Sequence, residues 1–280
     1  MNIRQAINKA MVKLKTNKIE SPNLKARMLM QFVLDKPRQY ILVRDDEELD
    51  LNTLNKYLET VDKLCENIPI EHITHMKEFM KMNFYVDENV LIPRQDTEVL
   101  VEEVIEIAKR NNSIKILDLC TGSGAIAVSL AKYIEKADIT AVDISNNALN
   151  IAKLNANKNG VSDKITFVLS DMFENIAKQR YDIIVSNPPY IKTTVCNNLD
   201  EEVKKEPRLA LDGGKDGLDF YRKIIKQGYE YLKYNGYLCL EIGYDQKIDV
   251  IELMEEQYID IYSKKDMYQN DRIVVGRIGD

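Results

Sequence analysis

Residues 183–190 read Ile-Ile-Val-Ser-Asn-Pro-Pro-Tyr, an apolar run that enters a stiff turn, and the rest of the chain is organised around them. The branched apolar residues favour a buried strand, and each proline fixes its own φ and restrains the residue before it. Neither proline has an N–H, so the turn offers acceptors, the Asn187 side-chain oxygen and the Pro188 carbonyl, beside the aromatic face of Tyr190. They suit a planar guest with a conjugated NH2 group, such as a Gln or Asn side chain, adenine or cytosine. On spacing alone, the turn could also be an ordinary strand exit.

Helix and strand patterns alternate around this turn, from Pro93 to the end of the chain. Such alternation is typical of an open parallel sheet with helices on both faces, the α/β class. The expected strands are 114–119, 138–142, 165–169, 182–185, 237–242 and two closing strands, the last at about 272–276. The expected helices are about 97–109, 125–133, 220–232 and 246–256, with one more that Ser145 caps.

Ligands of such sheets bind at the carboxyl ends of the strands. Asp118 to Gly124 (Asp-Leu-Cys-Thr-Gly-Ser-Gly) lies at one such end, where glycines allow close approach and a helix begins. Asp143 ends the next strand, where a carboxylate could accept both ribose hydroxyls. Asp171 and Met172 end the third and place polar and apolar groups where an adenine could lie. A dinucleotide site is less favoured, because the third glycine of G-x-G-x-x-G is missing.

The first 66 residues predict a small helical bundle without candidate chemistry. Apolar residues recur at helical spacing from Ile3 to Leu14, after the Ser21-Pro22 cap, and from Leu54 to Cys65. Near Pro69 the pattern changes, and alternation at 82–86, a turn at 87–89 and an apolar run at 90–92 predict a β-hairpin that joins two domains. His72 and His75 lack ligand partners at metal spacing, so a structural role is expected and no metal.

Composition limits the partners. A net charge of −6 and a pI near 5.3 argue against a protein that grips nucleic acid by its phosphates. Four widely spaced cysteines predict free thiols in a reducing cytosol rather than disulfides or zinc. No export signal and no apolar run long enough for a membrane span are present, so a cytoplasmic protein is expected.

Taken together, these motifs resemble those of the seven-stranded S-adenosylmethionine-dependent methyltransferases, and more closely the bacterial release factor glutamine methyltransferases (the HemK/PrmC group). The resemblance covers essentially the whole chain. The N-P-P-Y turn alone marks several amino-group methyltransferases, but its combination with Leu91-Ile92-Pro93-Arg94 and Asp96-Thr97-Glu98 is more specific. Glu206-Pro207 and Asn270-Asp271-Arg272 also fit.

The resemblance implies a Rossmann-like methyltransferase domain at 94–280, after a helical substrate-docking domain at 1–67 and a linker with a β-hairpin at 68–93. It implies methyl transfer from S-adenosylmethionine to the glutamine side chain of the Gly-Gly-Gln motif in class I peptide chain release factors. By position, the cofactor would be bound by Cys120, Thr121, Gly122, Ser123, Gly124, Asp143, Met172 and Asn187. The catalytic residues would be Asn187, Pro188 and Tyr190, and Pro189 would complete the glutamine pocket with them.

Three positions depart from the family pattern: Cys120 and His75 stand where glycine is frequent, and Gln95 replaces a common proline. Two other functions compete with the implied one. A DNA adenine methyltransferase would make the same demands on the turn, but the acidic pI and the lack of a basic recognition domain oppose it. A non-enzymatic cofactor-binding regulator is opposed by the intact N-P-P-Y turn. The segment 191–219 is long enough for a functional flap, or it is a solvated loop.

Overall fold

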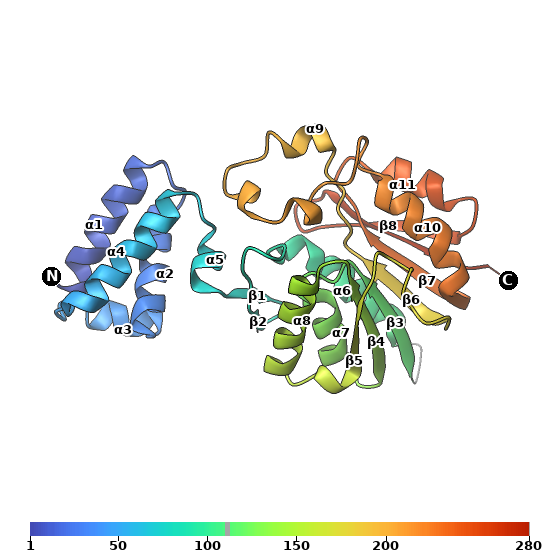
Figure 1. Ribbon diagram of the computed structural model, residues 1–280, viewed down its shortest axis with the longest axis horizontal. Helices are drawn as coiled ribbons and strands as arrows, with labels where there is room; N and C mark the ends of the chain where they lie inside the picture. Colours follow the sequence, from blue (N-terminus) through green and yellow to red (C-terminus); the bar gives the residue numbers. More distant parts are fainter. Residues whose placement is uncertain (110–112, 280) are drawn as a thin grey trace. The chain divides into compact units, whose positions relative to one another are not determined.

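The computed structural model describes residues 1–109 and 113–279 of the chain. Two compact units form within it (Figure 1). The first contains Met1–Met76 together with Asp200–Lys205, and the second contains Lys77–Leu199 and Glu206–Asp280. The short piece Asp200–Lys205 thus packs with the N-terminal helices, although the sequence around it belongs to the second unit.

The first unit is a helical bundle, as predicted. Its core is formed by the apolar stripe of the first helix, including Ile3, Ile7 and Leu14, packed against side chains such as Leu29 and Val61. A capping box formed by Asn2 and Gln5 starts the chain, because each side chain binds the other residue's backbone N–H. The helices are α1 (Ile3–Thr16), α2 (Pro22–Leu34), α3 (Arg38–Val43), α4 (Leu51–Cys65) and α5 (Ile70–Thr74).

Ser21 and Pro22 start α2 as expected, since Ser21 is the N-cap residue and Pro22 is the first residue of the helix, but the Ser21 backbone is left-handed, with φ +50°, and its side chain makes no capping hydrogen bond. The expected β-hairpin was placed wrongly. The hairpin is β1 (Lys77–Phe79) paired with β2 (Met82–Phe84), and its turn lies at Met80 and Lys81 rather than at 87–89. Both turn residues have positive φ, a conformation that the sequence pattern did not reveal because neither is Gly, Asn or Asp.

The second unit is built on a seven-stranded sheet in the order β5-β4-β3-β6-β7-β9-β8. The five strands from β5 to β7 are parallel, but β9 runs antiparallel between β7 and β8, so the sheet is mixed rather than wholly parallel. The short turn between β8 and β9 explains this, since only antiparallel neighbours can be joined without a crossover. The strands are β3 (Ile114–Leu119), β4 (Ala137–Asp143), β5 (Ile165–Leu169), β6 (Tyr181–Ser186), β7 (Leu232–Glu241), β8 (Ile259–Lys265) and β9 (Asp271–Arg277).

Helices cover both faces of this sheet (Figure 1). Alternate side chains of β3 enter different cores: Ile116 packs with apolar residues of α6, α7 and α8, whereas Leu117 packs with those of α10 and α11. The helices are α6 (Glu98–Ala108), α7 (Ala125–Tyr133), α8 (Asn146–Lys158), α9 (Thr193–Cys196), α10 (Asp219–Tyr231) and α11 (Lys247–Met254), with short 3-10 turns η1 (Gln95–Thr97), η2 (Ser162–Lys164), η3 (Val203–Lys205) and η4 (Arg208–Ala210). Ser145 caps α8 as expected, accepting from the Ala148 N–H.

Two of the departures from the family pattern have a structural explanation. His75 ends α5 with φ +52°, and Cys120 follows β3 with φ +59°. Both are left-handed conformations, which glycine adopts without the steric cost of a Cβ. Glycine is therefore the natural residue at these positions, and this chain holds a left-handed backbone there with side chains that do not favour it.

No helix in the described part of the chain has the length and apolarity needed to cross a membrane. Across residues 1–109 and 113–279, no group of three or more His, Cys, Asp and Glu side chains is arranged to hold a metal ion.

Candidate active site

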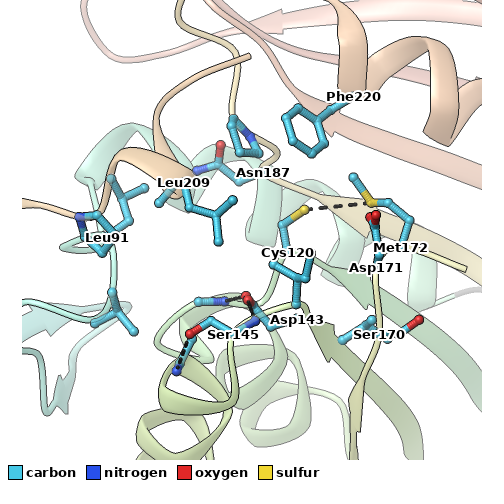
Figure 2. Close-up of a pocket in the computed structure, with 18 of the residues that line it drawn as sticks. Leu91, Cys120, Asp143, Ser145, Ser170, Asp171, Met172, Asn187, Leu209 and Phe220 are labelled. Atoms are coloured by element: carbon cyan, nitrogen blue, oxygen red, sulfur yellow. Dashed lines mark hydrogen bonds between the residues drawn. The ribbon is translucent and has the colours of Figure 1, made fainter. Parts of the chain in front are cut away.

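The carboxyl ends of β3, β4, β5 and β6 surround a pocket of about 310 Å³ within the second unit (Figure 2). Register explains why they meet there: Leu119 pairs with both Val142 and Ser186, and Asp143 pairs with Leu169, so the residues that follow each strand lie along one edge. The strand ends contribute Cys120, Gly122, Val142, Asp143, Ile144, Ser170, Asp171, Met172, Asn187 and Pro189. Further lining residues are Asn89, Val90, Leu91, Ser145, Ala148, Pro207, Leu209, Ala210, Phe220 and Lys223.

The turn after β3 brings backbone to the pocket wall. The Thr121 N–H donates to the Val142 carbonyl at 2.9 Å, which fastens the turn to the neighbouring strand. Gly122 has φ +54°, and a Cβ built there would meet nothing within 4 Å, so the residue leaves open space beside the pocket. Gly124 has φ +79°, and its Cβ would lie 3.0 Å from that of Ala152 on α8. One glycine therefore keeps space open for a ligand, and the other allows two helices to pack closely.

Asp143 ties the turn to the second strand. One carboxylate oxygen accepts from the Gly122 N–H at 2.8 Å and the other from the Ser145 N–H at 2.9 Å. Burial raises the pKa of Asp143, although these backbone N–H groups oppose the rise. The carboxylate is thus held rigidly at the edge of the pocket, with lone pairs left to accept hydrogen bonds from a ligand.

Two sulfur-containing side chains, Cys120 after β3 and Met172 after β5, lie together at the pocket wall. The Sγ of Cys120 lies 4.0 Å from the Sδ of Met172, and Figure 2 shows the two side chains pointing toward each other. Met172 also has a left-handed backbone, with φ +49°. Burial raises the pKa of the Cys120 thiol, so it stays neutral. Together these side chains offer an apolar, polarisable surface of the kind that accommodates a planar ring or a sulfur-containing ligand.

The N-P-P-Y turn follows β6, and one hydrogen bond holds the Asn187 side chain while another holds the end of the strand before it. The Asn187 Nδ2 donates to the Thr97 Oγ1 at 3.3 Å, and Oδ1 has no donor among the residues that the structure describes. The Ser186 hydroxyl donates to the Leu119 carbonyl at 2.7 Å, which fixes the strand end below. The amide of Asn187 is therefore oriented by Thr97, with its oxygen left as the acceptor.

A buried carboxylate lies beside this turn. Glu241 is the last residue of β7 and is 1% exposed, and the Tyr190 hydroxyl lies 3.4 Å from its Oε1. Burial raises the pKa of Glu241 to about 7, while hydrogen bonding to Thr97 and the charge of Arg272 lower it. The sequence predictions did not include Glu241 or the contact of Thr97 with Asn187.

The segment after the turn folds back over it. Glu206 is buried and accepts from the Ile92 N–H at 2.9 Å, and it pairs with Arg94. The Ile191 N–H donates to the Leu211 carbonyl, and the Gly213 N–H to the Ile191 carbonyl. These bonds tie the part of 191–219 that belongs to the second unit to the pocket rim, where Pro207 and Leu209 line the wall.

The residues predicted for the site fall into two groups. Those that line the pocket are Cys120, Gly122, Asp143, Met172, Asn187 and Pro189. Thr121, Ser123, Gly124, Pro188 and Tyr190 are not among the residues that line this pocket. The Thr121 hydroxyl donates to Asp118, the Ser123 carbonyl accepts from the Asn155 amide, and the Tyr190 hydroxyl contacts Glu241. The sequence predictions missed Leu209, which lies two residues after Pro207, and Phe220, which is the second residue of α10.

The close approach of Gly213 to the turn gives a testable prediction. A Cβ at Gly213 would lie 2.6 Å from the Tyr190 Cα and 2.8 Å from the Pro189 carbonyl oxygen, both backbone atoms that cannot move aside. Gly213→Ala should therefore displace the turn and lower kcat roughly 10²-fold, the scale of a misplacement of about 1 Å. Gly228→Ala on α10 is the matched control, because its nearest contacts are side-chain ends at 3.4 Å. Steady-state kinetics on both variants should separate them; equal activities would show that the turn tolerates displacement.

Comparison with known proteins agrees with this architecture. The Methyltransferase small domain family matches residues 95–268, and the PrmC N-terminal domain family matches residues 5–74. A methyltransferase structure from Pyrococcus furiosus superposes with a TM-score of 0.54 at 15% identity, covering 73% of this chain and 92% of that one, which shows a shared fold.

Curated relatives match over nearly the whole chain. The release factor glutamine methyltransferase of Clostridium acetobutylicum is 38% identical over 279 residues, 98% of each chain. That of Moorella thermoacetica is 41% identical over 246 residues, 88% of this chain and 87% of its own. With both domain families matched in order and the relatives covered almost completely, this chain belongs to the release factor glutamine methyltransferase family of S-adenosylmethionine-dependent methyltransferases.

Proposed function

We propose that the protein transfers a methyl group from S-adenosylmethionine to the side-chain amide nitrogen of the glutamine in the Gly-Gly-Gln motif of class I peptide chain release factors. The observation that supports this most directly is the Asn187 amide at the pocket wall, with its nitrogen held by Thr97 and its oxygen free to accept. Family membership supports the substrate class, and the acceptor chemistry of the turn supports the amide group.

The pocket fits the proposed cofactor. Its volume of about 310 Å³ lies at the lower end of the range for small-molecule sites. Open space beside Gly122 allows a ligand to approach the backbone, and Asp143 offers a rigid carboxylate for ribose hydroxyls. Cys120, Met172 and Phe220 provide apolar surface, seen with Asp143 and Asn187 around the same space in Figure 2. We assign cofactor binding to these groups, with the glycine-containing turn from Cys120 to Gly124 as the frame.

The chemical difficulty lies in the nitrogen that receives the methyl group. An amide nitrogen is a poor nucleophile, because its electron pair is delocalised into the carbonyl. When bound, S-adenosylmethionine supplies an activated methyl group on a sulfonium, and a nitrogen–carbon bond forms as the carbon–sulfur bond breaks. The protein must hold the amide nitrogen in line with that methyl group at near-attack distance, which is a task of positioning.

Asn187 and Pro188 carry the electronic part of this task in our proposal. As the nitrogen attacks, it becomes positive and its N–H groups become stronger donors. Acceptors fixed at the Asn187 Oδ1 and the Pro188 carbonyl then bind more tightly in the transition state than in the ground state. An asparagine serves better than an aspartate, since an unpaired buried carboxylate would be costly to desolvate. Pro189 and Tyr190 complete the turn, and the methylated amide releases its proton to water.

The decisive experiment uses a purified class I release factor, S-adenosylmethionine and the protein, with the product located by mass spectrometry. We expect one methyl group on the motif glutamine and none on a release factor whose motif reads Gly-Gly-Ala. A methyl group on another residue would overturn the proposal. Retention on heparin at moderate salt, with methylation of DNA adenine, would favour the alternative that the acidic charge balance opposes.

Replacing Asp143 tests the cofactor half of the proposal. Asp143→Ala removes the carboxylate expected to accept ribose hydroxyls, and hydrogen bonds to a charged group contribute about 1.5–3 kcal/mol each. Affinity for S-adenosylmethionine, measured by calorimetry, should fall at least about tenfold. Asp138→Ala, an exposed residue near the other end of the same strand, should leave affinity unchanged. An unchanged Kd for Asp143→Ala would remove this residue from the cofactor site.

A further inference from the structure

One buried side chain joins the end of the N-P-P-Y turn to two neighbouring parts of the chain. Gln246 directly precedes α11 and is 4% exposed. Its Nε2 donates to the Tyr190 carbonyl at 3.0 Å and to the Gly217 carbonyl at 3.2 Å. Its Oε1 accepts from the Gly243 N–H at 2.9 Å. The turn is therefore connected through Gln246 to the loop before α10 and to the chain that leaves β7.

The chemistry of these partners calls for a side-chain amide. Two backbone carbonyls need donors and one backbone N–H needs an acceptor, and an amide supplies both kinds of group from one planar unit. An ionised glutamate of the same length could not donate to either carbonyl. An apolar side chain would leave all three backbone groups without these bonds, which is costly in a buried place. The same partners fix the orientation of the amide, with the Gln246 nitrogen toward the turn.

Gly217 allows the loop before α10 to approach this amide closely. Its φ is +81°, and a Cβ built there would lie 2.7 Å from the Gln246 Nε2 and closer still to the Tyr190 carbonyl oxygen. A side chain at this position would therefore push the amide away from the carbonyl. Both hydrogen bonds of the Gln246 nitrogen thus depend on a residue without a Cβ.

Hydrogen bonds to the backbone carbonyls of the turn are few. Among the described residues, Gln246 is the one group that donates to a backbone carbonyl of residues 187–190. Within the same part of the chain, the Pro188 carbonyl receives no donor, which agrees with the acceptor role proposed for it. Because each proline fixes its own φ, a shift of the Tyr190 carbonyl is passed back along the turn to the Pro188 carbonyl.

We propose that Gln246 is a positioning residue for methyl transfer: its bond to the end of the turn sets where the Pro188 carbonyl and the Asn187 amide lie relative to the nitrogen to be methylated. This inference rests on the proposed function, because it concerns the placement of the same acceptors. Gln246 is not among the residues that line the pocket, and in this role it contacts neither cofactor nor substrate.

Two variants test this role. The methylation rate is measured in a single turnover at saturating release factor and divided by the number of S-adenosylmethionine sites that calorimetry counts. Gln246→Glu keeps the length and the acceptor for the Gly243 N–H, but it sets a carboxyl group against two carbonyl oxygens. Its rate per site should fall about 10²-fold, the scale of a displacement of about 1 Å. Gln246→Leu removes all three bonds without adding a charge, so its rate per site should fall less, about tenfold.

Counting sites separates positioning from stability. A variant that merely folds poorly loses sites, whereas each site that remains works at the normal rate. For both variants, the Kd for S-adenosylmethionine and the KM for release factor should stay within about threefold of those of the unmodified protein, because the lost interaction acts on the chemical step.

Tyr258→Phe is the matched control. Tyr258 follows α11, and its buried hydroxyl donates to the Ile225 carbonyl at 3.0 Å, so the variant also removes a buried bond from a side chain to the backbone. Tyr258 is not among the pocket residues. The variant should lower the melting temperature slightly and keep the rate per site.

The outcomes distinguish the two proposals. If the unmodified protein places no methyl on the motif glutamine, the proposed function fails. If it does, and both Gln246 variants keep the unmodified rate per site, the positioning role alone is wrong. An equal fall in Tyr258→Phe would also overturn the positioning role, because the loss would then follow from any weakened buried contact.

Discussion

Asn187→Ala should lower kcat about 10²–10³-fold, the usual scale for losing one group aimed at developing charge. The structure supplies the reason: the side chain lines the pocket, and Thr97 holds its nitrogen, so its oxygen is fixed before substrate arrives. A fixed acceptor acts in the transition state without reorganising. Cofactor affinity should change less than turnover.

Single-turnover kinetics with saturating release factor and cofactor provide the measurement. Asn198→Ala is a suitable control, because Asn198 is exposed and its amide binds only the Thr194 carbonyl among the described residues. It should turn over at the rate of the unmodified protein. Near-normal turnover of Asn187→Ala would show that the acceptor mechanism is wrong.

Removing the N-terminal helices should lower kcat/KM on intact release factor about 10²-fold. This loss corresponds to about 2.8 kcal/mol of binding free energy from docking. These helices carry no candidate chemistry, yet an active site that methylates a loop of a folded protein benefits from a surface that orients the whole substrate. The loss should appear mainly in KM, because docking precedes the chemical step. Reaction with a short Gly-Gly-Gln peptide should change little.

The structure changes the residue at which the shortened chain should start. The sequence alone suggests a chain that starts near Ile68, but Ile70 and Ile73 belong to the helical core, and the first unit extends to Met76. A chain that starts at Lys77 removes the bundle cleanly. Because Asp200–Lys205 pack with the first unit, calorimetry with S-adenosylmethionine must first show that the shortened chain binds the cofactor. Equal losses on protein and peptide would mean that the helices only stabilise the fold.

Most of the sheet was predictable because its signals are local. The strand Ile114–Leu119 and the helix Ala125–Tyr133 were predicted with the bounds that they have, since an apolar run, a glycine turn and a helical stripe follow one another within twenty residues. The direction of β9 was not predictable in this way. It depends on which neighbour the strand pairs with, and the mixed sheet results from that pairing.

Part of the site was also predictable, for a related reason. Residues at the carboxyl ends of parallel strands must meet at one edge, so Cys120, Asp143 and Asn187 were expected together, and all three line the pocket. Leu209 was missed because it reaches the pocket from a long segment whose path no period describes, and Phe220 because a helical pattern does not tell which ligand pocket the first turn of α10 borders. The left-handed backbone at Cys120 was not predicted either, because a residue with a Cβ rarely adopts it; the one sign was that glycine is frequent at this position in the family that the chain resembles.

The sequence by itself determined the order of the elements, the family and the turn that carries the acceptor, because these depend on hydrophobic period, proline stiffness and short motifs. Only the tertiary structure decided what stands behind that turn. Thr97 lies 90 positions from Asn187 in the chain, and Tyr190 lies 51 from Glu241. No local pattern links such residues; strand order and register bring them together, and burial strengthens the hydrogen bonds that they form.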